Sequence, residues 1–455
     1  MIASNKRLIL VLLIFAISLQ PVPARPTLPA GNNGAVSLSL NQAVEHAITY
    51  NAEIQGARAD VDIAISQIRE IMATGLPQVN ASVGYQYYFE IPTSLVPAEF
   101  FGGQPGEFAE IQFGTEQSLN ASATISQMIF DGSYIVGLRA ARIYRELAEQ
   151  NTERSEMEVR NSVSETYFVA LLSRDNKNIV ALNIENLRQR LAETEKTSEA
   201  GFTDPINADQ LRLSVSNMEN TLKNLERQHE LTLNLLKFQS GIDIDRNIEL
   251  SDSLGPLFNR MIIESDAGEF SNEDHIDYRI MLSRKNMNIM NLRREQSFYL
   301  PSLSLTYTYQ QMAMRNEFNF HDSDRPWFPS SFLAVNLSIP VFSSGFRSAR
   351  VQQARIEVDK SEIAARQLSE SLRLQTEEAR LQLNAALDQY RSERENLDLA
   401  ERILERTVIM HREGMASSLE LTQANDQMLT TRANYYNAMF EFVTAKNNLD
   451  KARGL

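Results

Sequence analysis

Histidine is the side chain most often used to move protons or bind metal ions near neutral pH, and this chain of 455 residues has five. They are His46, His229, His275, His321 and His411. All five lie far apart in the sequence. None belongs to a spacing such as H-E-x-x-H, which places two imidazoles on one face of a helix. The histidines therefore indicate neither a metal site nor a hydrolase.

A glycine-rich run at residues 101–106 is the second candidate for chemistry. A phosphate cradle needs such glycines to lead into the first turn of a helix, and no helix start follows this run. The run is therefore typical of a loop. The absence of cysteine excludes thiolate metal sites, disulfides, a cysteine nucleophile and a lipid-bearing cysteine. We expect neither an enzyme nor a bound cofactor.

The charge balance also limits the partners. The chain has 58 acidic and 44 basic side chains, and its formal net charge is −14. Recognition of phosphate backbones needs a basic face, so this balance argues against nucleic acid as a partner.

The N-terminus has the pattern of a secretory signal peptide. Lys6 and Arg7 precede an apolar run at residues 8–19, and the small residue Ala24 follows. This run is shorter than the ~20 apolar residues that a membrane-spanning helix needs. We expect cleavage after Ala24, so that residues 1–24 are removed and the exported protein is periplasmic, secreted, or inserted in a membrane as strands.

Two stretches without proline or glycine must be long helices. One lies between Gly137 and Gly201, and the other covers residues 346–413. Both are rich in strong helix formers, and apolar side chains recur in them every seven residues. Those side chains are Val163, Ala170, Ile184 and Leu191 in the first stretch, with Lys177 interrupting, and Leu383, Tyr390, Leu397 and Leu404 in the second. Each helix would be roughly 100 Å long and packed side by side with others.

The glycine spacing indicates a tandem repeat. Gly132 and Gly201 are 69 residues apart, and so are Gly345 and Gly414. Each pair is followed by a further 40-residue helical segment, ending at Gly241 and Gly454. We predict a first repeat at residues 25–272 and a second at residues 273–455, each built as helix, two strands, long helix and short helix, the first also containing a middle segment.

Four segments of about 10 residues alternate apolar side chains with Ser, Thr, Asn or Gln. Their apolar residues are Val79, Ala81, Val83 and Tyr85; Leu119, Ala121, Ala123 and Ile125; Leu303, Leu305, Tyr307 and Tyr309; and Leu333, Val335, Leu337 and Ile339. Uncharged polar faces of this length suit strands with lipid on one side and a watery lumen on the other. The alternative is four ordinary strands of a soluble β-domain.

Four spanning strands cannot close a barrel, because the smallest stable closures use about 8 strands. The strands would therefore be shared among subunits. A dimer would supply 8 strands and a trimer 12, and the pattern alone does not choose between them.

This order of elements resembles the TolC family of outer-membrane efflux proteins, also called outer membrane factors. The matching residues are Leu76-Pro77 and Leu300-Pro301 at the strand starts, Ile129-Phe130-Asp131-Gly132 and Val341-Phe342-Ser343-Ser344-Gly345 at the strand-to-helix turns, and Gly201 and Gly414 at the helical tips. The resemblance implies an α+β membrane protein. Its homotrimer would form a 12-stranded outer-membrane β-barrel continuous with a long periplasmic α-helical barrel.

The resemblance also implies a function and partners. The protein would be a passive exit duct that extends from the outer membrane of a Gram-negative-type bacterium into the periplasm, and would carry substrates from an inner-membrane pump and a periplasmic adaptor to the exterior. Outer-membrane lipid would surround the strands. Small-molecule efflux is our first choice; the alternatives are a type I protein secretion duct and a non-conducting periplasm-spanning scaffold. The adaptor would contact the tip residues Gly201, Phe202, Thr203, Gly414 and Met415.

The family's periplasmic gate maps onto the tips. Glu420 matches the first of two inward-pointing acidic positions beyond the second tip, and Gln423 occupies the other. Asn207 holds the equivalent place in the first repeat. His411 and Ala416 replace the tyrosine and arginine that brace the closed tip in the family. The alternative is that Glu420 simply begins the returning helix as a solvated acid.

The remaining segments follow from the same plan. Residues 38–75 and 202–240 should be half-length helices stacked end to end along the tunnel. Residues 242–272 should join the C-terminus in a band around its middle. Residues 90–116 and 313–330 should be extracellular loops.

Overall fold

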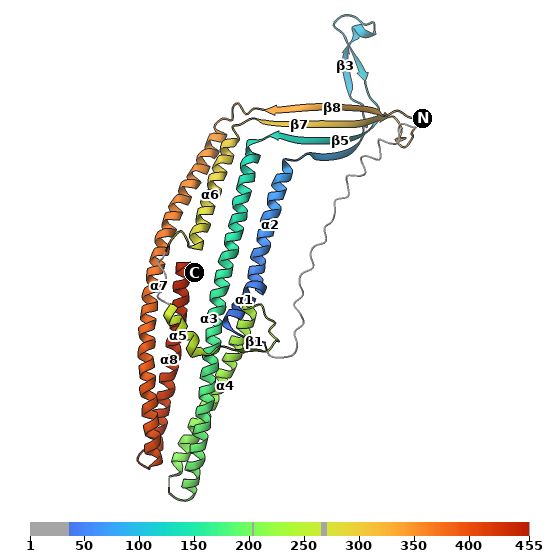
Figure 1. Ribbon diagram of the computed structural model, residues 1–455. Helices are drawn as coiled ribbons and strands as arrows, with labels where there is room; N and C mark the ends of the chain where they lie inside the picture. Colours follow the sequence, from blue (N-terminus) through green and yellow to red (C-terminus); the bar gives the residue numbers. More distant parts are fainter. Residues whose placement is uncertain (1–35, 203, 265–270, 455) are drawn as a thin grey trace.

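The structure is a computed structural model that describes residues 36–202, 204–264 and 271–454. A long bundle of helices carries a sheet at one end, and a hairpin projects from the sheet (Figure 1). The expected signal peptide at residues 1–24 lies outside the described residues.

Helices and strands follow one another in the expected order. The helices are α1 (Leu40–Tyr50), α2 (Ala52–Thr74), the 3-10 helix η2 (Ala98–Phe101), α3 (Gly132–Glu199), α4 (Pro205–Gln239), α5 (Leu254–Glu264), α6 (Ile276–Ser297), α7 (Phe346–Arg412) and α8 (Ser418–Arg453). The strands are β1 (Val36–Leu38), β2 (Gln78–Tyr87), β3 (Thr93–Pro97), β4 (Phe108–Gln112), β5 (Gln117–Phe130), β6 (Ile248–Leu250), β7 (Ser302–Arg315) and β8 (Phe328–Ser338).

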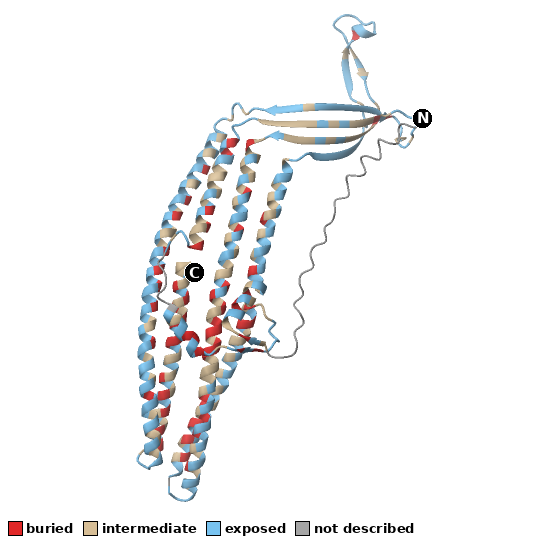
Figure 2. Cartoon of the chain, viewed as in Figure 1, coloured by how far each residue is buried: buried red, intermediate tan, exposed pale blue. Residues whose placement is uncertain are grey.

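The two long helices are confirmed: α3 has 68 residues and α7 has 67. α2 and α4 pack along successive parts of α3, and α6 and α8 do the same along α7 (Figure 1). Several positions of the seven-residue rows are buried, among them Val163, Ala170, Leu383 and Tyr390. Buried residues run along the contacting helix faces while the outer faces stay exposed (Figure 2). No helix in the described ranges is both long enough and apolar enough to cross a membrane.

The expected single helix at residues 38–75 is two helices, because Asn51 interrupts it. Asn51 is extended, with ψ 133°, and serves as C-cap of α1 and N-cap of α2. Its side-chain Oδ1 accepts from the backbone N–H groups of Glu53 and Ile54. Its Nδ2 donates to the carbonyl of Gln239 at 2.8 Å, at the end of α4. The break therefore lies where the stacked half-length helices α2 and α4 meet.

The four predicted strands are confirmed and form one antiparallel sheet in the order β2-β5-β7-β8. Their register places most of the polar residues on one face and most of the apolar ones on the other. One polar rung is Asn80, Thr124 and Thr308, which ends at Phe332 on β8. The next rung is apolar and consists of Val79, Ile125, Tyr307 and Leu333. Hydroxyl pairs join neighbouring strands on the polar face, at 2.8 Å for Ser82–Ser122 and 3.2 Å for Thr124–Thr308. β2 and β8 each keep one edge without a strand partner within the described chain.

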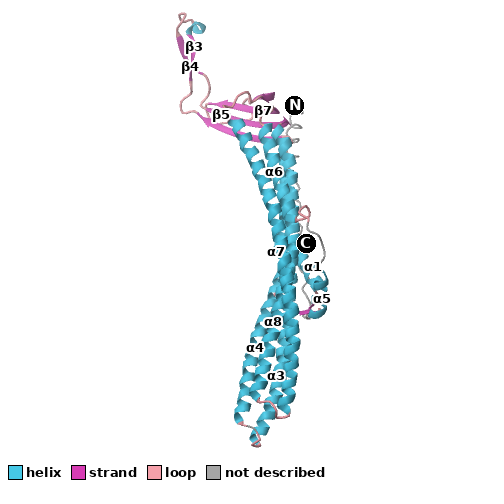
Figure 3. Ribbon diagram, turned by 90° about the vertical axis from the view of Figure 1, so that its left-hand side faces the viewer, coloured by secondary structure: helices cyan, strands magenta, loops and turns pink. Residues whose placement is uncertain are grey.

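The first expected extracellular loop, residues 90–116, is partly structured. β3 pairs with β4 in a hairpin that stands away from the sheet (Figures 1 and 3). The glycine-rich run forms its turn: Gly102 and Gly106 have φ of 80° and 93°, a region that glycine adopts without a Cβ penalty. The second loop is shorter than the expected residues 313–330, because β7 extends to Arg315 and β8 begins at Phe328.

A small layer lies beside the middle of the bundle. β1 pairs with β6 in parallel, and α5 packs nearby (Figure 3). The fully buried Tyr167 of α3 places its hydroxyl 2.8 Å from both the Leu38 carbonyl and the Asp252 carboxylate. Burial and the Asp252 charge raise the pKa of Tyr167, so this phenol is a neutral donor that fastens the layer to α3.

Candidate functional site

The first helical tip is a tight turn closed by its backbone. α3 ends at Glu199, and Gly201 follows with φ 79°. The Gly201 N–H donates to the carbonyl of Ser198 and the Phe202 N–H to that of Thr197, both at 2.9 Å. This pair of bonds is the Schellman arrangement, which needs a left-handed residue and so favours glycine.

The second tip, between α7 and α8, repeats this geometry. Gly414 has φ 75°, its N–H donates to the carbonyl of His411 at 3.1 Å, and the Met415 N–H donates to that of Met410 at 2.8 Å. The equal glycine spacing in the two repeats therefore reflects equal turns. At the other ends of the long helices the glycines differ: Gly345 is left-handed, whereas Gly132 begins α3 against Leu300.

Large apolar side chains stand out from both tips. Phe202 is 85% exposed and Met415 67% exposed. Ile206 and Leu419, in the first turns of the returning helices, are also exposed. Exposed apolar groups gathered at one end of a protein are typical of a contact surface. Thr203, the remaining expected contact residue, lies outside the described residues.

Glu420 makes a capping box at the start of α8. Its carboxylate Oε2 accepts from the Ser417 N–H at 2.7 Å and from the Ser417 hydroxyl at 2.9 Å, while the Glu420 N–H donates to Ser417 Oγ at 3.2 Å. The hydrogen bonds from the Ser417 backbone and side chain lower the pKa of Glu420. Within one chain Glu420 thus begins the returning helix. Gln423 lies one turn further on and is exposed.

The structure brings other expected residues together in a cleft of about 630 Å³ between the two tips. Those residues are Phe202, Asn207, His411 and Gly414; Glu420 and Gln423 are not among its lining residues. His411 Nε2 lies 3.3 Å from Ser418 Oγ. Burial and the nearby Arg190 charge lower the pKa of His411, so that its neutral form is favoured.

Two arginines of this cleft were missed by the sequence reasoning. Arg190 reaches it from α3 and Arg412 from the last turn of α7. Burial is the main cause that lowers the pKa of Arg190; the Arg412 charge lowers it further, and Glu193 opposes the shift. They lie 222 positions apart in the chain, so only the tertiary arrangement that brings both into one cleft could reveal their proximity.

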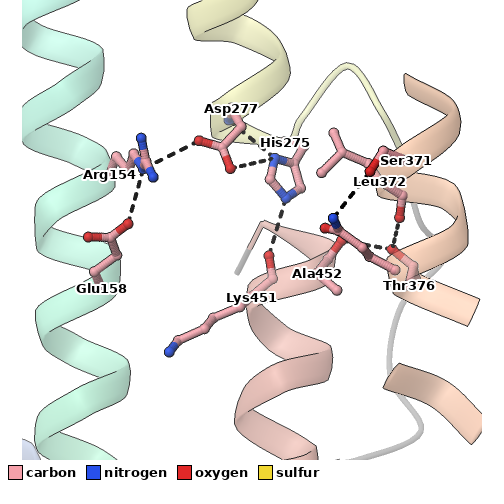
Figure 4. Close-up of polar contacts among 10 residues, drawn as sticks. Arg154, Glu158, His275, Asp277, Ser371, Leu372, Thr376, Lys451 and Ala452 are labelled. Carbon is pink, nitrogen blue, oxygen red and sulfur yellow. Dashed lines mark hydrogen bonds and ion pairs between the residues drawn. The ribbon is translucent and has the colours of Figure 1, made fainter. Parts of the chain in front are cut away.

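His275, directly before α6, is the buried centre of a junction of polar contacts (Figure 4). This end of α6 lies midway along the bundle (Figure 1). It is the N-cap of α6, and its ring also lies beside the Lys451 carbonyl at the end of α8. At the same helix end, the Thr376 hydroxyl of α7 donates to the Ala452 carbonyl at 2.8 Å. Asp277 of α6 pairs with Arg154 of α3 at 3.3 Å. These contacts join four helices and are structural. In the part of the chain described, no group of three or more His, Asp or Glu side chains is arranged to hold a metal ion.

Comparison with known proteins gives the family. The family described as outer membrane efflux protein matches residues 43–241 and 290–455, which include both long helices and both tips. The chain belongs to the outer membrane efflux protein family. Its general role is therefore efflux through a channel of the outer membrane.

Individual relatives agree over nearly the whole chain. The outer membrane efflux protein BepC of Brucella suis biovar 1 (strain 1330) is 20% identical over 431 residues, which cover 92% of this chain and 86% of BepC. The crystal structure of CusC matches with a TM-score of 0.72 and 17% identity, covering 95% of this chain and 97% of CusC. The Campylobacter jejuni CmeC outer membrane channel matches with a TM-score of 0.69 and 16% identity, covering 94% and 90%.

Proposed function

We propose that three copies of this protein form an outer-membrane exit duct with a 12-stranded barrel and a periplasmic helical tunnel. The sheet carries this proposal. Its outer strands β2 and β8 each have one edge without a strand partner within the described chain, and backbone groups at a strand edge cannot stay unpaired in lipid. Its apolar face is exposed, for example at Val83 (74%) and Leu333 (63%). Pairing β2 of one copy with β8 of the next satisfies both edges and turns this face to lipid.

The tips are the proposed docking site for a periplasmic adaptor. Phe202 and Met415 offer exposed apolar contacts at the end furthest from the sheet (Figure 1). The duct is passive, and an inner-membrane pump supplies the energy and selects the cargo. We favour small molecules as cargo, in keeping with the efflux description of the family.

The proposed gate is a ring of three Glu420 carboxylates near the tunnel axis, with Gln423 one turn further along each helix. Three like charges that converge would oppose ionisation and attract cations. The capping box holds each carboxylate at the tip and leaves it exposed, which suits this role.

Cysteine cross-linking tests the docking. Because the chain has no cysteine, a single Phe202→Cys or Met415→Cys change introduces the sole thiol. Both variants should cross-link to a co-expressed adaptor, whereas the matched control Gln78→Cys, at the start of β2, should not. Cross-links found only with the control would contradict docking at the tips.

A further inference from the structure

The cleft between the tips has an unbalanced positive charge. The ionisable side chains that line it are Arg190, Glu193, Arg412 and His411, and the neutral form of His411 is favoured. Two guanidinium groups remain charged at any physiological pH, and one carboxylate offsets only one of them. The cleft is therefore cationic in a chain whose formal net charge is −14.

Other arginines near the tips have carboxylate partners at hydrogen-bonding distance, whereas Arg190 and Arg412 do not. Arg188 pairs with Glu219 at 2.6 Å, and Arg212 pairs with Glu195 at 2.7 Å. Within the described ranges, the side chains of Arg190 and Arg412 form no hydrogen bond and no close ion pair, and Glu193 acts on Arg190 through its charge alone. Arg190 is also half-buried, so water solvates its charge incompletely.

The α4 side of the cleft has no acidic side chain among its lining residues. Asn207, from the first turn of α4, lines the cleft with a neutral amide. Glu193 is exposed and its Oε1 accepts a hydrogen bond from Gln189 at 3.3 Å. The arginines thus face a polar space of about 630 Å³ that is rich in amides and hydroxyls.

We propose that this cleft binds a small divalent oxyanion of the sulfate or phosphate class between Arg190 of α3 and Arg412 of α7. Planar guanidinium groups donate paired N–H bonds to such oxygens, so each of the two arginines can bind one pair of the anion's oxygens. The amide of Asn207 is a further donor on the α4 side. A bound anion links the α3–α4 tip to the α7–α8 tip. If the protein is the proposed duct, this link stabilises the two tips side by side.

Sulfate is the probe, because its charge does not change between pH 6 and pH 8. Calorimetric titration of the full-length protein in detergent, with chloride setting a constant ionic strength, should show saturable binding of one sulfate per chain. Arg190→Gln and Arg412→Gln should each weaken it at least tenfold, and Arg190→Lys should weaken it less than Arg190→Gln. Asn207→Asp should abolish it, because an internal carboxylate then occupies the cleft.

Arg188→Gln is the matched control. It removes one positive charge from α3 two residues away, outside the cleft, and should leave the affinity unchanged. The absence of saturable binding in the wild type, or an equal loss in Arg188→Gln and Arg190→Gln, would overturn the proposal. Bilayer conductance of the same preparations is a separate measurement, so a conducting protein that binds no sulfate refutes this site and leaves the duct intact.

Discussion

The ring of His275 joins two helix ends, since its Nε2 lies 3.2 Å from the carbonyl oxygen of Lys451 at the end of α8. Its Nδ1 accepts from the Asp277 N–H at 3.1 Å, in the first turn of α6. A carbonyl can only accept and an N–H can only donate, so the neutral tautomer with the proton on Nε2 serves both contacts. This one buried side chain satisfies orphan backbone groups of two helices.

His275→Ala should destabilise the protein by about 2–4 kcal/mol. The change removes an N-cap worth ~1 kcal/mol and leaves a buried carbonyl without its donor, which costs about 1–3 kcal/mol. Thermal unfolding of the detergent-solubilised protein, followed by circular dichroism, measures the loss. His321→Ala, at an exposed loop position, is the control and should have little effect. Equal stability of the two variants would contradict the capping role.

Replacing Gly201 or Gly414 with alanine should cost about 1–2 kcal/mol each, the penalty of a Cβ in the left-handed region. An added Cβ at either position meets no atom within 4 Å, so the cost comes from φ alone. Gly137, inside α3, also has open space and a helical φ. Gly137→Ala should therefore stabilise the protein by about 0.5–1 kcal/mol. A lower stability of the Gly201 and Gly414 variants and a higher stability of the Gly137 variant, in the same unfolding assay, would support the turn geometry. Stability changes of the same sign at all three positions would contradict it.

The tips should lose stability in acid through His411. The pKa of His411 in the folded chain lies below the ordinary 6.5, so the unfolded chain binds more protons between these two values. The contribution of neutral His411 to the free energy of unfolding is complete above about pH 6.5 and falls as the pH drops toward the folded pKa of His411. Below that folded pKa the contribution no longer changes. Burial and the Arg190 charge oppose protonation of His411. Arg412 and Glu193 are the other charged side chains that line the cleft. Hydrogen exchange at the tips, corrected for intrinsic rates, should be faster at pH 5.5 than at pH 7.5, and His411→Gln should reduce the difference.

Glu420→Gln separates the gate role from the capping role. Glutamine at this position can also complete a capping box, so the variant keeps the helix start but removes the charge. If three Glu420 side chains form the ring, the variant should show weaker cation preference and weaker block by multivalent cations in single-channel recordings. Glu420→Ala should do the same and also loosen the start of α8. Unchanged selectivity and block in Glu420→Gln would leave Glu420 with the capping role only.

Patterns local in the sequence were enough to predict most of the architecture. The spacing of Gly201 and Gly414 predicted the ends of the two long helices, and the resemblance predicted the tips there. Both glycines have positive φ, which explains the residue preference at these turns. The break at Asn51 was missed because asparagine is tolerated inside helices and its contact with Gln239 depends on tertiary packing. The β3–β4 hairpin was missed because two five-residue strands give little alternation to detect.

The site was less predictable than the fold. The expected tip residues followed from the resemblance, and the structure brings Asn207 and His411 into one cleft. Arg190 lies beside the core position Leu191 in a helix rich in exposed arginine, so nothing in its local sequence distinguishes it. Its environment depends on α7, which follows it by more than 150 residues.

Single-channel recording after reconstitution into a planar bilayer tests the central claim most directly. The purified protein should run as a trimer and insert with discrete, uniform conductance steps, because a closed barrel continuous with a tunnel gives one aqueous path per trimer. A periplasm-spanning scaffold without a pore would give no current across the bilayer. Trimeric protein that inserts into the bilayer and conducts no current would contradict the proposed duct.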